Sequence, residues 1–455
     1  MSMITRKIVP QPRSLRRTNR GSSSICWTFL HLTPWRFLFF FFAVSNSIWG
    51  FDWPEFRGPT GQGDASSANL PLQWSEDNHV SWKVPIPGKG HSSPVISAGQ
   101  IWLTTALADG GRLHAICFAE SSGNLLYNVE LFQNERPELL HADNSHATPT
   151  AVIDKGRIYV HFGANGTACL TSEGKVVWKT NALQYRQPYS GASSPVLFED
   201  LLLLTCDGTD VQFVVALDKE TGQVVWKTDR QHLERAKEET AATTGKRQGY
   251  STMAYATGLL IEVAGGKQFV SPGADHVAAY NPQTGKEIWW LEYLGFSEVA
   301  RPVIAGDLLI VQAFQEQSKP TLFAIHPTAQ GRVNEKYLVW QRNKNTPHVP
   351  SPLVSGNLLF LVKDSGTASC LDVRTGKEHW TKRIGGNFSA SSILAGNNVY
   401  CFSEEGTTTI FAAQSEFQLQ AKNHIDGRIM ASPAVSENAL FVRTDGHLYR
   451  IEAPD

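Results

Sequence analysis

The sequence predicts an all-β protein, an eight-bladed β-propeller of four-stranded antiparallel blades, and three observations support this. A hairpin of one type recurs, and its clearest copy is Val215–Lys227 (VALDKETGQVVWK), where two strand-forming runs flank a turn closed by Thr221-Gly222. A second landmark, a small-residue pair followed by two short β-runs, occurs eight times. The landmarks recur about every 40 to 60 residues, as expected for one blade per repeat, and units that cannot bury their own apolar face need stacked neighbours.

The hairpin supplies the third and fourth strands of each predicted blade. Looser copies are Cys117–Tyr127, Cys169–Trp178, Ala279–Trp290 and Cys370–Trp380. We expect Gly222 to occupy a turn position and Asp218 to bind the backbone of its own turn. The expected anchors of the fourth strands are Tyr127, Trp178, Trp226, Trp289, Trp340, Trp380 and Leu419.

The landmark supplies the first and second strands. Its copies are marked by Pro94, Pro149, Pro195, Met253, Pro302, Pro352, Ser392 and Pro433. The last unit ends after a third strand, and an isolated strand with Trp82 has no partner near it in the sequence. We expect this N-terminal strand to complete the last blade and close the ring, which removes an exposed sheet edge. The copy at Ser251 is the least regular, and seven blades would follow if it were accidental.

The first fifty residues have the layout of an export signal. Basic residues precede the apolar run Phe37–Val44 (FLFFFFAV), which small and polar residues follow. The alternative is an uncleaved membrane anchor, since Ile25–Leu32 lengthens the apolar region, although His31 and Pro34 interrupt it before it reaches the ~18–20 residues of a membrane helix. We therefore expect an exported protein that is periplasmic or secreted.

The rest of the chain divides into an arm and one domain. Residues 51–71 begin with FDWPEFRGPTGQG, which has no strand periodicity, and we expect an ordered arm with Trp53 and Phe56 tucked into a crevice. Residues 72–455 form the propeller, which we expect to be a monomer. Residues 1–50 hold seven Lys or Arg and no Asp or Glu, which leaves 34 basic against 42 acidic side chains in the rest. This balance gives no indication of a nucleic-acid partner.

Five cysteines follow the export signal, and an odd number cannot pair completely within one chain. Cys117, Cys169 and Cys370 share one position of the hairpin, so they belong to different blades. We expect buried structural thiols, not disulfides or metal ligands.

Four long connections interrupt the repeats. Phe132–His146, Asn181–Ser190 and Asp229–Gly249 precede first strands, and Gly265–Asp275 is expected to lie between a second and a third strand. Both kinds of connection emerge on one face of a propeller, so this face is the expected binding face. The alternative is a decorative rim without a function.

The hairpin pattern AxDxxTGxxxW, in eight units, resembles that of the pyrroloquinoline-quinone (PQQ)-like β-propeller family. The resemblance covers about residues 70–452, and the DWPEFRGPTGQG arm resembles the start of exported planctomycete-type members. The family includes quinoprotein alcohol dehydrogenases and the non-enzymatic outer-membrane barrel-assembly lipoprotein. Its repeat specifies the fold and leaves the function open.

The resemblance to dehydrogenases lacks its chemical markers here. The family's alcohol dehydrogenases carry adjacent cysteines over the cofactor and a Ca²⁺ site beside a catalytic Asp, whereas this sequence has no Cys-Cys pair and no Asp-rich cluster. It also lacks HExxH, GxSxG and Cys-x-x-Cys motifs. We therefore expect no catalytic residues, no metal and no cofactor, with PQQ and Ca²⁺ as the alternative.

One group of polar residues precedes the first strands, where we expect the mouth of the central channel. The candidate ligand-binding residues are His91, His146, Tyr189, Tyr250, Arg301, His348 and Arg428, with Glu298 and Asn387 beside them. Arg301 and Arg428 would suit an anionic or quinone-like ligand. The alternatives are a water-filled polar mouth and a metal site, for which the three histidines lie in blades too far apart.

Together these patterns predict a non-catalytic exported scaffold that binds a protein or a cell-envelope component through the long-loop face. The alternative function is a PQQ-dependent oxidoreductase that acts on alcohols or sugars.

Overall fold

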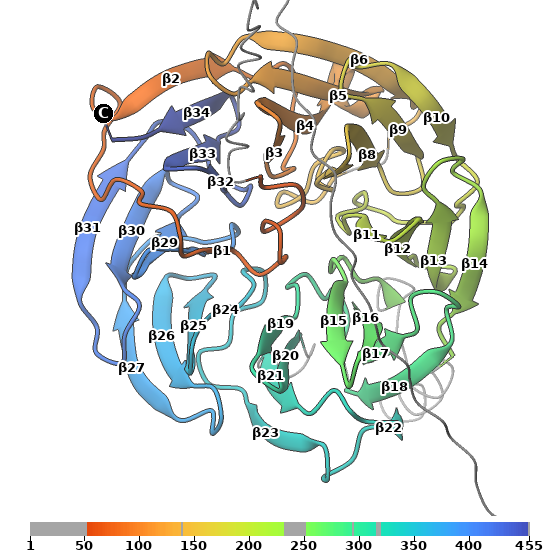
Figure 1. The fold of residues 1–455 in the computed structure, drawn as a ribbon, viewed down its shortest axis with the longest axis vertical. Coiled ribbons are helices and arrows are strands. Elements are labelled where there is room, and N and C mark those ends of the chain that lie inside the picture. Colours follow the sequence, from red (N-terminus) through yellow and green to blue (C-terminus); the bar gives the residue numbers. More distant parts are fainter. Residues whose placement is uncertain (1–51, 138–139, 232–251, 294, 315–319, 454–455) are drawn as a thin grey trace, which may run out of the picture. The chain divides into compact units, whose positions relative to one another are not determined.

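The computed structural model describes residues 52–453 except 138–139, 232–251, 294 and 315–319. Its strands form eight sheets arranged as the blades of a ring (Figure 1). The predicted all-β propeller of eight four-stranded antiparallel blades is therefore confirmed. Within the described ranges no helix has the length and apolar character needed to cross a membrane. The predicted export signal lies outside these ranges.

The blades are numbered here by their innermost strands, and each runs from the channel outwards. Blade 1 is β3–β6 (Val95–Ser97, Gln100–Leu107, Arg112–Ala119, Leu125–Gln133), with the short 3₁₀ helix η1 (Ala108–Gly110). Blade 2 is β7–β10 (Val152–Asp154, Arg157–His161, Thr167–Thr171, Val176–Thr180). Blade 3 is β11–β14 (Val196–Phe198, Leu201–Asp207, Gln212–Asp218, Val224–Asp229). Blade 4 is β15–β18 (Leu259–Val263, Gly266–Gly273, His276–Tyr280, Glu287–Glu292).

The second half of the ring repeats this plan. Blade 5 is β19, β20, β21 and β23 (Val303–Ala305, Leu308–Ala313, Thr321–Ile325, Leu338–Arg342), and the short β22 (Gly331–Arg332) pairs with β18. Blade 6 is β24–β27 (Leu353–Ser355, Leu358–Lys363, Thr367–Asp372, Glu378–Arg383). Blade 7 is β28–β31 (Ile393–Ala395, Asn398–Phe402, Thr407–Ala412, Leu419–His424). Blade 8 is β32–β34 (Ala434–Ser436, Ala439–Arg443, His447–Ile451) with β2 (Val80–Pro85), whose Val80 lies opposite Ile451.

The recurrent hairpin docks each blade onto the next. In blade 3, Asp218 Oδ1 accepts hydrogen bonds from the backbone N–H of Thr221 (2.8 Å) and of Glu220 (3.1 Å), so the acidic residue holds the turn as predicted. Gly222 has φ +72°, and a Cβ at that position would lie 2.5 Å from Trp178 of blade 2. Only glycine fits this close approach.

The anchor tryptophans complete this contact. Trp178 Nε1 donates to Lys219 O of the next blade at 2.9 Å, and Trp340 Nε1 donates to Val373 O at 2.8 Å. Each anchor lies opposite a small residue of its own blade, as Trp226 does to Ala216 and Trp380 to Cys370. The large indole therefore fills the space that the small residue leaves.

Blade 7 differs from the prediction. Leu419 was expected as its anchor, but its side chain is 49% exposed, and the anchor register belongs to Ala421 opposite Ile410. The large and small residues are exchanged between the two strands here. The prediction failed because it searched for a large residue in the fourth strand.

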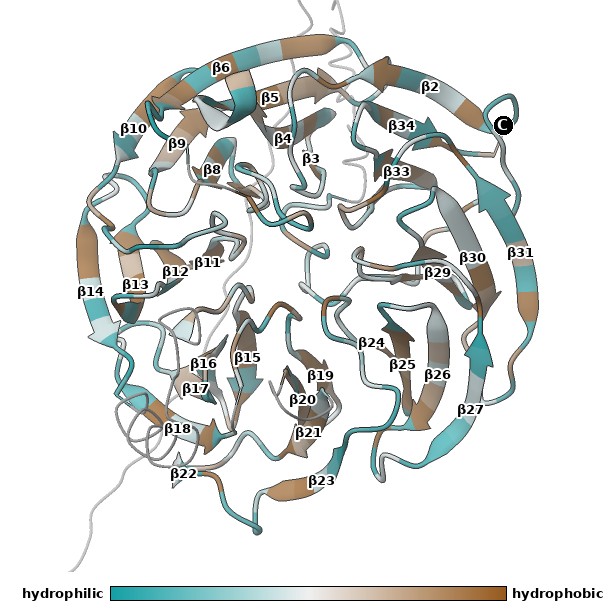
Figure 2. Cartoon of the chain, turned by 180° about the vertical axis from the view of Figure 1, so that it is seen from behind, coloured by the Kyte–Doolittle hydropathy of each residue, from teal (hydrophilic) through white to brown (hydrophobic). Residues whose placement is uncertain are grey.

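The apolar cores lie between neighbouring blades. One cluster joins blades 1 and 2 through residues such as Trp102 and Phe162, and another joins blades 4 and 5 through Trp289 and Phe323. Figure 2 shows hydrophobic colour over inner strands such as β20 and β25, whereas the outer β27 and β31 are mostly hydrophilic. All five cysteines of the described ranges are buried and free, which confirms the prediction of buried thiols.

Blade 4 corrects the predicted register. Gly265–Asp275 was expected as an insertion, yet most of it forms β16, which pairs with β15 through a tight turn at Ala264 (φ +50°) and Gly265 (φ +77°). The run that follows Ser251 therefore supplies one strand where two were expected. Thr257 lies two residues before β15, so the first strand of this blade begins later in the chain than the register mark predicted at Met253.

The N-terminal arm lies across the inner strands, and Figure 1 shows it in red crossing the centre of the ring. Trp53 is fully buried and pairs with Ile96 of blade 1, while Pro54 O accepts the Ile153 N–H of blade 2 at 2.8 Å. Further on, β1 (Asp64–Ala65) runs parallel to β28 of blade 7. The predicted burial of Trp53 is thus confirmed.

Candidate functional site

A cavity of about 390 Å³ lies in the central channel, at the end where the connections into the first strands emerge. We call this end the loop face and the end crossed by the arm the arm face. Phe56 of the arm contributes to the lining, so the arm helps to shape the cavity. A cavity of this size lies in the usual range for sites that bind small molecules.

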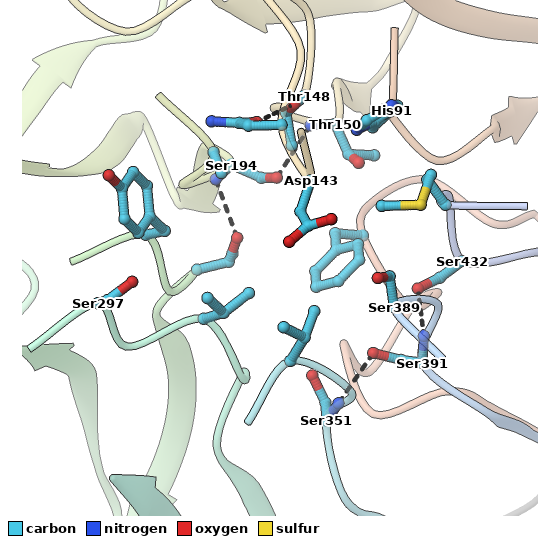
Figure 3. A pocket seen from close by; sticks show the side chains of 18 of the residues that line it. His91, Asp143, Thr148, Thr150, Ser194, Ser297, Ser351, Ser389, Ser391 and Ser432 are labelled. Atoms are coloured by element: carbon cyan, nitrogen blue, oxygen red, sulfur yellow. Dashed lines mark hydrogen bonds between the residues drawn. The ribbon is translucent and has the colours of Figure 1, made fainter. Parts of the chain in front are cut away.

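A ring of hydroxyl groups surrounds the channel in this cavity (Figure 3). Each comes from the residue two positions before a first strand, and the ring consists of Ser93, Thr150, Ser194, Thr257, Ser351, Ser391 and Ser432. The hydroxyl of one blade accepts the backbone N–H of the preceding blade, as Ser194 Oγ does from Thr150 N at 2.9 Å and Ser391 Oγ from Ser351 N at 3.1 Å. Because a hydroxyl oxygen that accepts still has its own proton, the ring offers hydrogen-bond donors to the channel.

Arg301 occupies the eighth position of the ring. Its backbone N–H donates to Ser351 Oγ at 3.0 Å, so the main-chain link continues. Its guanidinium, however, turns to the arm, where Nη1 donates to Phe56 O at 2.5 Å and Nη2 lies 3.4 Å from the Glu55 carboxylate. A Cβ on Gly61 would lie 2.4 Å from this guanidinium, which explains why the arm needs glycine there. The predicted anion-binding role of Arg301 is not supported by this position.

Asp143 brings the one carboxylate among the described residues of the lining, and its side chain points into the cavity (Figure 3). It lies in the connection before blade 2. Arg428 Nη2 is 3.6 Å from Asp143 Oδ1 but only 2.6 Å from Glu404 Oε2. His141 Nδ1 is 3.4 Å from the other Asp143 oxygen. Neither a lysine nor an arginine contributes to the described lining.

Three of the predicted site residues line this cavity, namely His91, Tyr189 and His348. Burial and the nearby positive charges of Arg443 and Arg428 lower the pKa of His91 to about 4, so its imidazole is neutral near pH 7. The His348 ring stacks on Phe314 with centroids 4.1 Å apart, and its Nε2 lies 3.1 Å from Ser297 O. The His348 ring is therefore held by both an aromatic stack and a backbone oxygen.

The other predicted residues lie elsewhere. His146 is buried against Gly110, where a Cβ would lie 2.2 Å from its ring, and Arg428 lies outside the lining in its ion pair with Glu404. Glu298 is buried, and its Oε2 accepts the Phe314 N–H at 2.8 Å. Asn387 binds Glu405 at 2.8 Å. Tyr250 and most of the predicted Asp229–Gly249 connection lie outside the described residues.

Sequence reasoning missed the hydroxyl ring and Asp143. The ring had a visible signal, since Ser or Thr recurs before the first strand in most of the landmarks. The recurring Ser or Thr was interpreted only as a small residue that allows close packing. Asp143 had no signal, because its connection is unique to one blade.

The described residues contain no group of three His, Cys, Asp or Glu side chains that could hold a metal ion. A catalytic cysteine is also not supported, because burial raises the pKa of Cys117, Cys169, Cys370 and Cys401 to about 12 and keeps these thiols protonated.

A family comparison identifies the repeat. The family model described as outer membrane protein assembly factor BamB, also called PQQ_2, matches residues 65–194 and 211–455. The chain belongs to this family. The resemblance seen in the hairpins is thereby confirmed, and the match covers the ring except for residues 195–210 of blade 3.

Solved structures show the same fold at low sequence identity. BamB from Moraxella catarrhalis is 13% identical with a TM-score of 0.57, and the match covers 82% of this chain and 97% of that one. A europium-containing methanol dehydrogenase is 11% identical with a TM-score of 0.64, over 87% and 90% of the two chains. The quinohemoprotein alcohol dehydrogenase from Comamonas testosteroni is 11% identical with a TM-score of 0.62, over 89% and 81%. BamB and the two dehydrogenases thus share one fold with this chain.

One curated relative is matched over a shorter stretch. The tetrathionate hydrolase of Acidithiobacillus ferrooxidans is 25% identical over 146 residues, which are 28% of this chain. The chain spans only 29% of the length of this relative. A match of this length shows similarity over only part of the ring.

The cavity does not fit the quinone that the dehydrogenases of this fold suggest. PQQ carries three carboxylates, which need cationic partners when they leave water. The described lining offers no arginine or lysine, and its one carboxylate would repel such a ligand. Arg301 is engaged by the arm, so it does not compensate.

Proposed function

We propose that this chain is a non-catalytic exported propeller that binds a protein or another component of the cell envelope through its loop face. The family description names an assembly factor, which supports a binding role without naming a partner. The loop face carries the long connections that contain Asp143 and Tyr189, and the arm occupies much of the opposite face. Binding residues commonly lie on long loops that a rigid scaffold positions.

The observation that carries this proposal is the chemistry of the cavity. His348 contacts a backbone oxygen and an aromatic ring, and His141 lies beside the Asp143 carboxylate. Among the described residues, none of the histidines of the lining is hydrogen-bonded to a serine or threonine hydroxyl of the lining or to a thiol. An activated nucleophile needs such a base within hydrogen-bond reach. The lining is therefore suited to binding and not to acyl or group transfer.

The proposal is tested by capture from envelope extracts with the tagged full chain. Leu140 on a loop-face connection is 39% exposed, and Leu126 on the outer strand β6 of the same blade is 43% exposed. We expect Leu140→Glu to reduce the recovery of a specific partner at least fivefold, whereas Leu126→Glu should leave it unchanged. Equal recovery with both variants, or loss only with Leu126→Glu, would contradict the assignment of the loop face.

A quinone-dependent dehydrogenase is the second candidate, because the methanol dehydrogenase shares the fold with a TM-score of 0.64. Its test is to mix the protein with PQQ and Ca²⁺ and to measure bound-cofactor absorbance and dye-linked alcohol oxidation. The scaffold proposal expects neither signal. Stoichiometric binding of PQQ together with alcohol oxidation would contradict the scaffold proposal and support the dehydrogenase.

A further inference from the structure

We propose that the channel cavity is a binding site for a small organic amine, with the ammonium group beside Asp143 and an oxygen acceptor at the hydroxyl ring. This inference goes beyond the capture of a partner and does not depend on it. Three features of the cavity carry it, namely the sign of its charge, its aromatic walls and the donors at its base.

The charge of the lining is negative. Among the described residues of the lining, Asp143 is the one carboxylate, and no lysine or arginine opposes it from within the cavity. Arg428 is the nearest guanidinium outside, but Glu404 holds it by two bonds, from Nη2 at 2.6 Å and from Nε at 3.0 Å. Since the Arg428–Glu404 pair is neutral as a unit, Asp143 retains the capacity to attract a cation.

The walls suit an apolar body with a cationic end. Phe56, Tyr189, Tyr255 and Phe296 all line the cavity. Aromatic faces attract ammonium groups through their quadrupoles, and they also bury the carbon skeleton of an amphipathic amine. A purely polar ligand would make no use of this apolar surface.

The base of the cavity offers hydrogen-bond donors. The hydroxyls of Ser194, Thr257 and Ser391 each accept one backbone N–H, from Thr150, Ser194 and Ser351 respectively. Their own O–H groups can therefore donate to a ligand oxygen. An amine with a phenol, ether or carbonyl oxygen at its far end satisfies both ends of the cavity.

Three probes of one shape separate the effect of charge from the effect of size. Tyramine is a cation, tyrosol is its neutral alcohol analogue and 4-hydroxyphenylacetate is its anion. Calorimetric titration of the full chain at pH 8 keeps histidines of ordinary pKa neutral and the amine protonated. We expect tyramine to bind at least threefold more tightly than tyrosol and at least tenfold more tightly than the carboxylate.

Three variants locate the effect. Asp143→Asn should lower the affinity for tyramine to that for tyrosol, while Asp77→Asn, a matched change at an exposed site outside the cavity, should leave the order intact. Ala192→Phe should fill the cavity and weaken the binding of tyramine and tyrosol together, and its unfolding midpoint checks that it folds.

Several outcomes would overturn the inference. These are no binding of any probe at millimolar concentration, equal binding of the amine and the carboxylate, or an unchanged order in Asp143→Asn. Loss of partner capture in Leu140→Glu with an intact probe order would leave this inference standing, so the two proposals fail separately.

Discussion

The two faces of the channel are built from the same eight repeats, yet they differ in chemistry. At the loop face, buried hydroxyls at repeated positions line an open cavity, and the connections add side chains that are exposed or half-buried, such as Asp143 and Tyr189. At the arm face, Trp53 and Arg57 are buried, and the buried Arg301 lies beside Glu55. The repeated positions build a symmetric ring, whereas one non-repeated segment makes one face a packed core and leaves the other for ligands.

The contrast predicts that truncation of an apolar side chain will lower the free energy of unfolding more at the arm face than at the loop face. Trp53→Ala should lower the free energy of unfolding by about 3–5 kcal/mol, because a fully buried indole leaves a cavity. Tyr189→Ala removes a half-buried ring from the loop face and should cost about 1 kcal/mol. Urea denaturation of the two variants measures both values. Similar losses would mean that the arm is not part of the folded core.

A pH change should affect a buried histidine of blade 2. Burial lowers the pKa of His161 to about 4, and its Nδ1 lies 2.8 Å from Thr167 Oγ1. Between about pH 6.5 and pH 4 the unfolded chain binds the proton and the folded chain does not, so stability falls as the pH falls through this window. The loss approaches about 3 kcal/mol for this group.

The matched variant for this effect is His161→Gln, which keeps a polar side chain but cannot titrate. Unfolding free energies at pH 7 and pH 4.5 should differ less for His161→Gln than for the wild type by about 2 kcal/mol. His91 and His146, whose pKa values burial also lowers, remain in both proteins and give the same direction. Equal pH dependence of the two proteins would contradict the assignment to His161.

The sequence predicted what repeats and missed what does not. The roles of Gly222 and Trp226 followed from their copies, because each recurs with the same spacing in other blades. The pair Arg301–Glu55 joins segments far apart in the chain, and no sequence repeat indicates it. Blade 4 was misplaced because Ser251 imitates the small residues that precede other first strands, while Thr257 holds the register in the structure.

Removal of one carboxylate from each face gives a third comparison. Glu55→Gln should lower the free energy of unfolding by about 2 kcal/mol, since it weakens a charged contact to the buried Arg301 guanidinium and removes the counter-charge of that side chain. Burial itself raises the pKa of Glu55, and Arg301 opposes this effect. Asp143→Asn should change stability by less than about 0.5 kcal/mol, because its side chain is 59% exposed. A larger loss for Asp143→Asn would reverse the proposed division into a structural and a binding carboxylate.

An effect smaller than that of Glu55→Gln is expected within the hydroxyl ring itself. Ser391→Ala removes the acceptor of the Ser351 N–H, and this buried donor would then have to find water in the cavity or remain unpaired. We expect a loss of about 1 kcal/mol in unfolding free energy, at the low end for a buried unpaired group because the ring borders the cavity. Ser297→Ala, a change of the same size in the same lining but outside the ring, should cost less. If the two variants lose equal stability, the hydroxyls of the ring do not stabilise the contact between blades. If Ser391→Ala loses more stability and also weakens tyramine binding, the same hydroxyl both joins two blades and contacts the ligand.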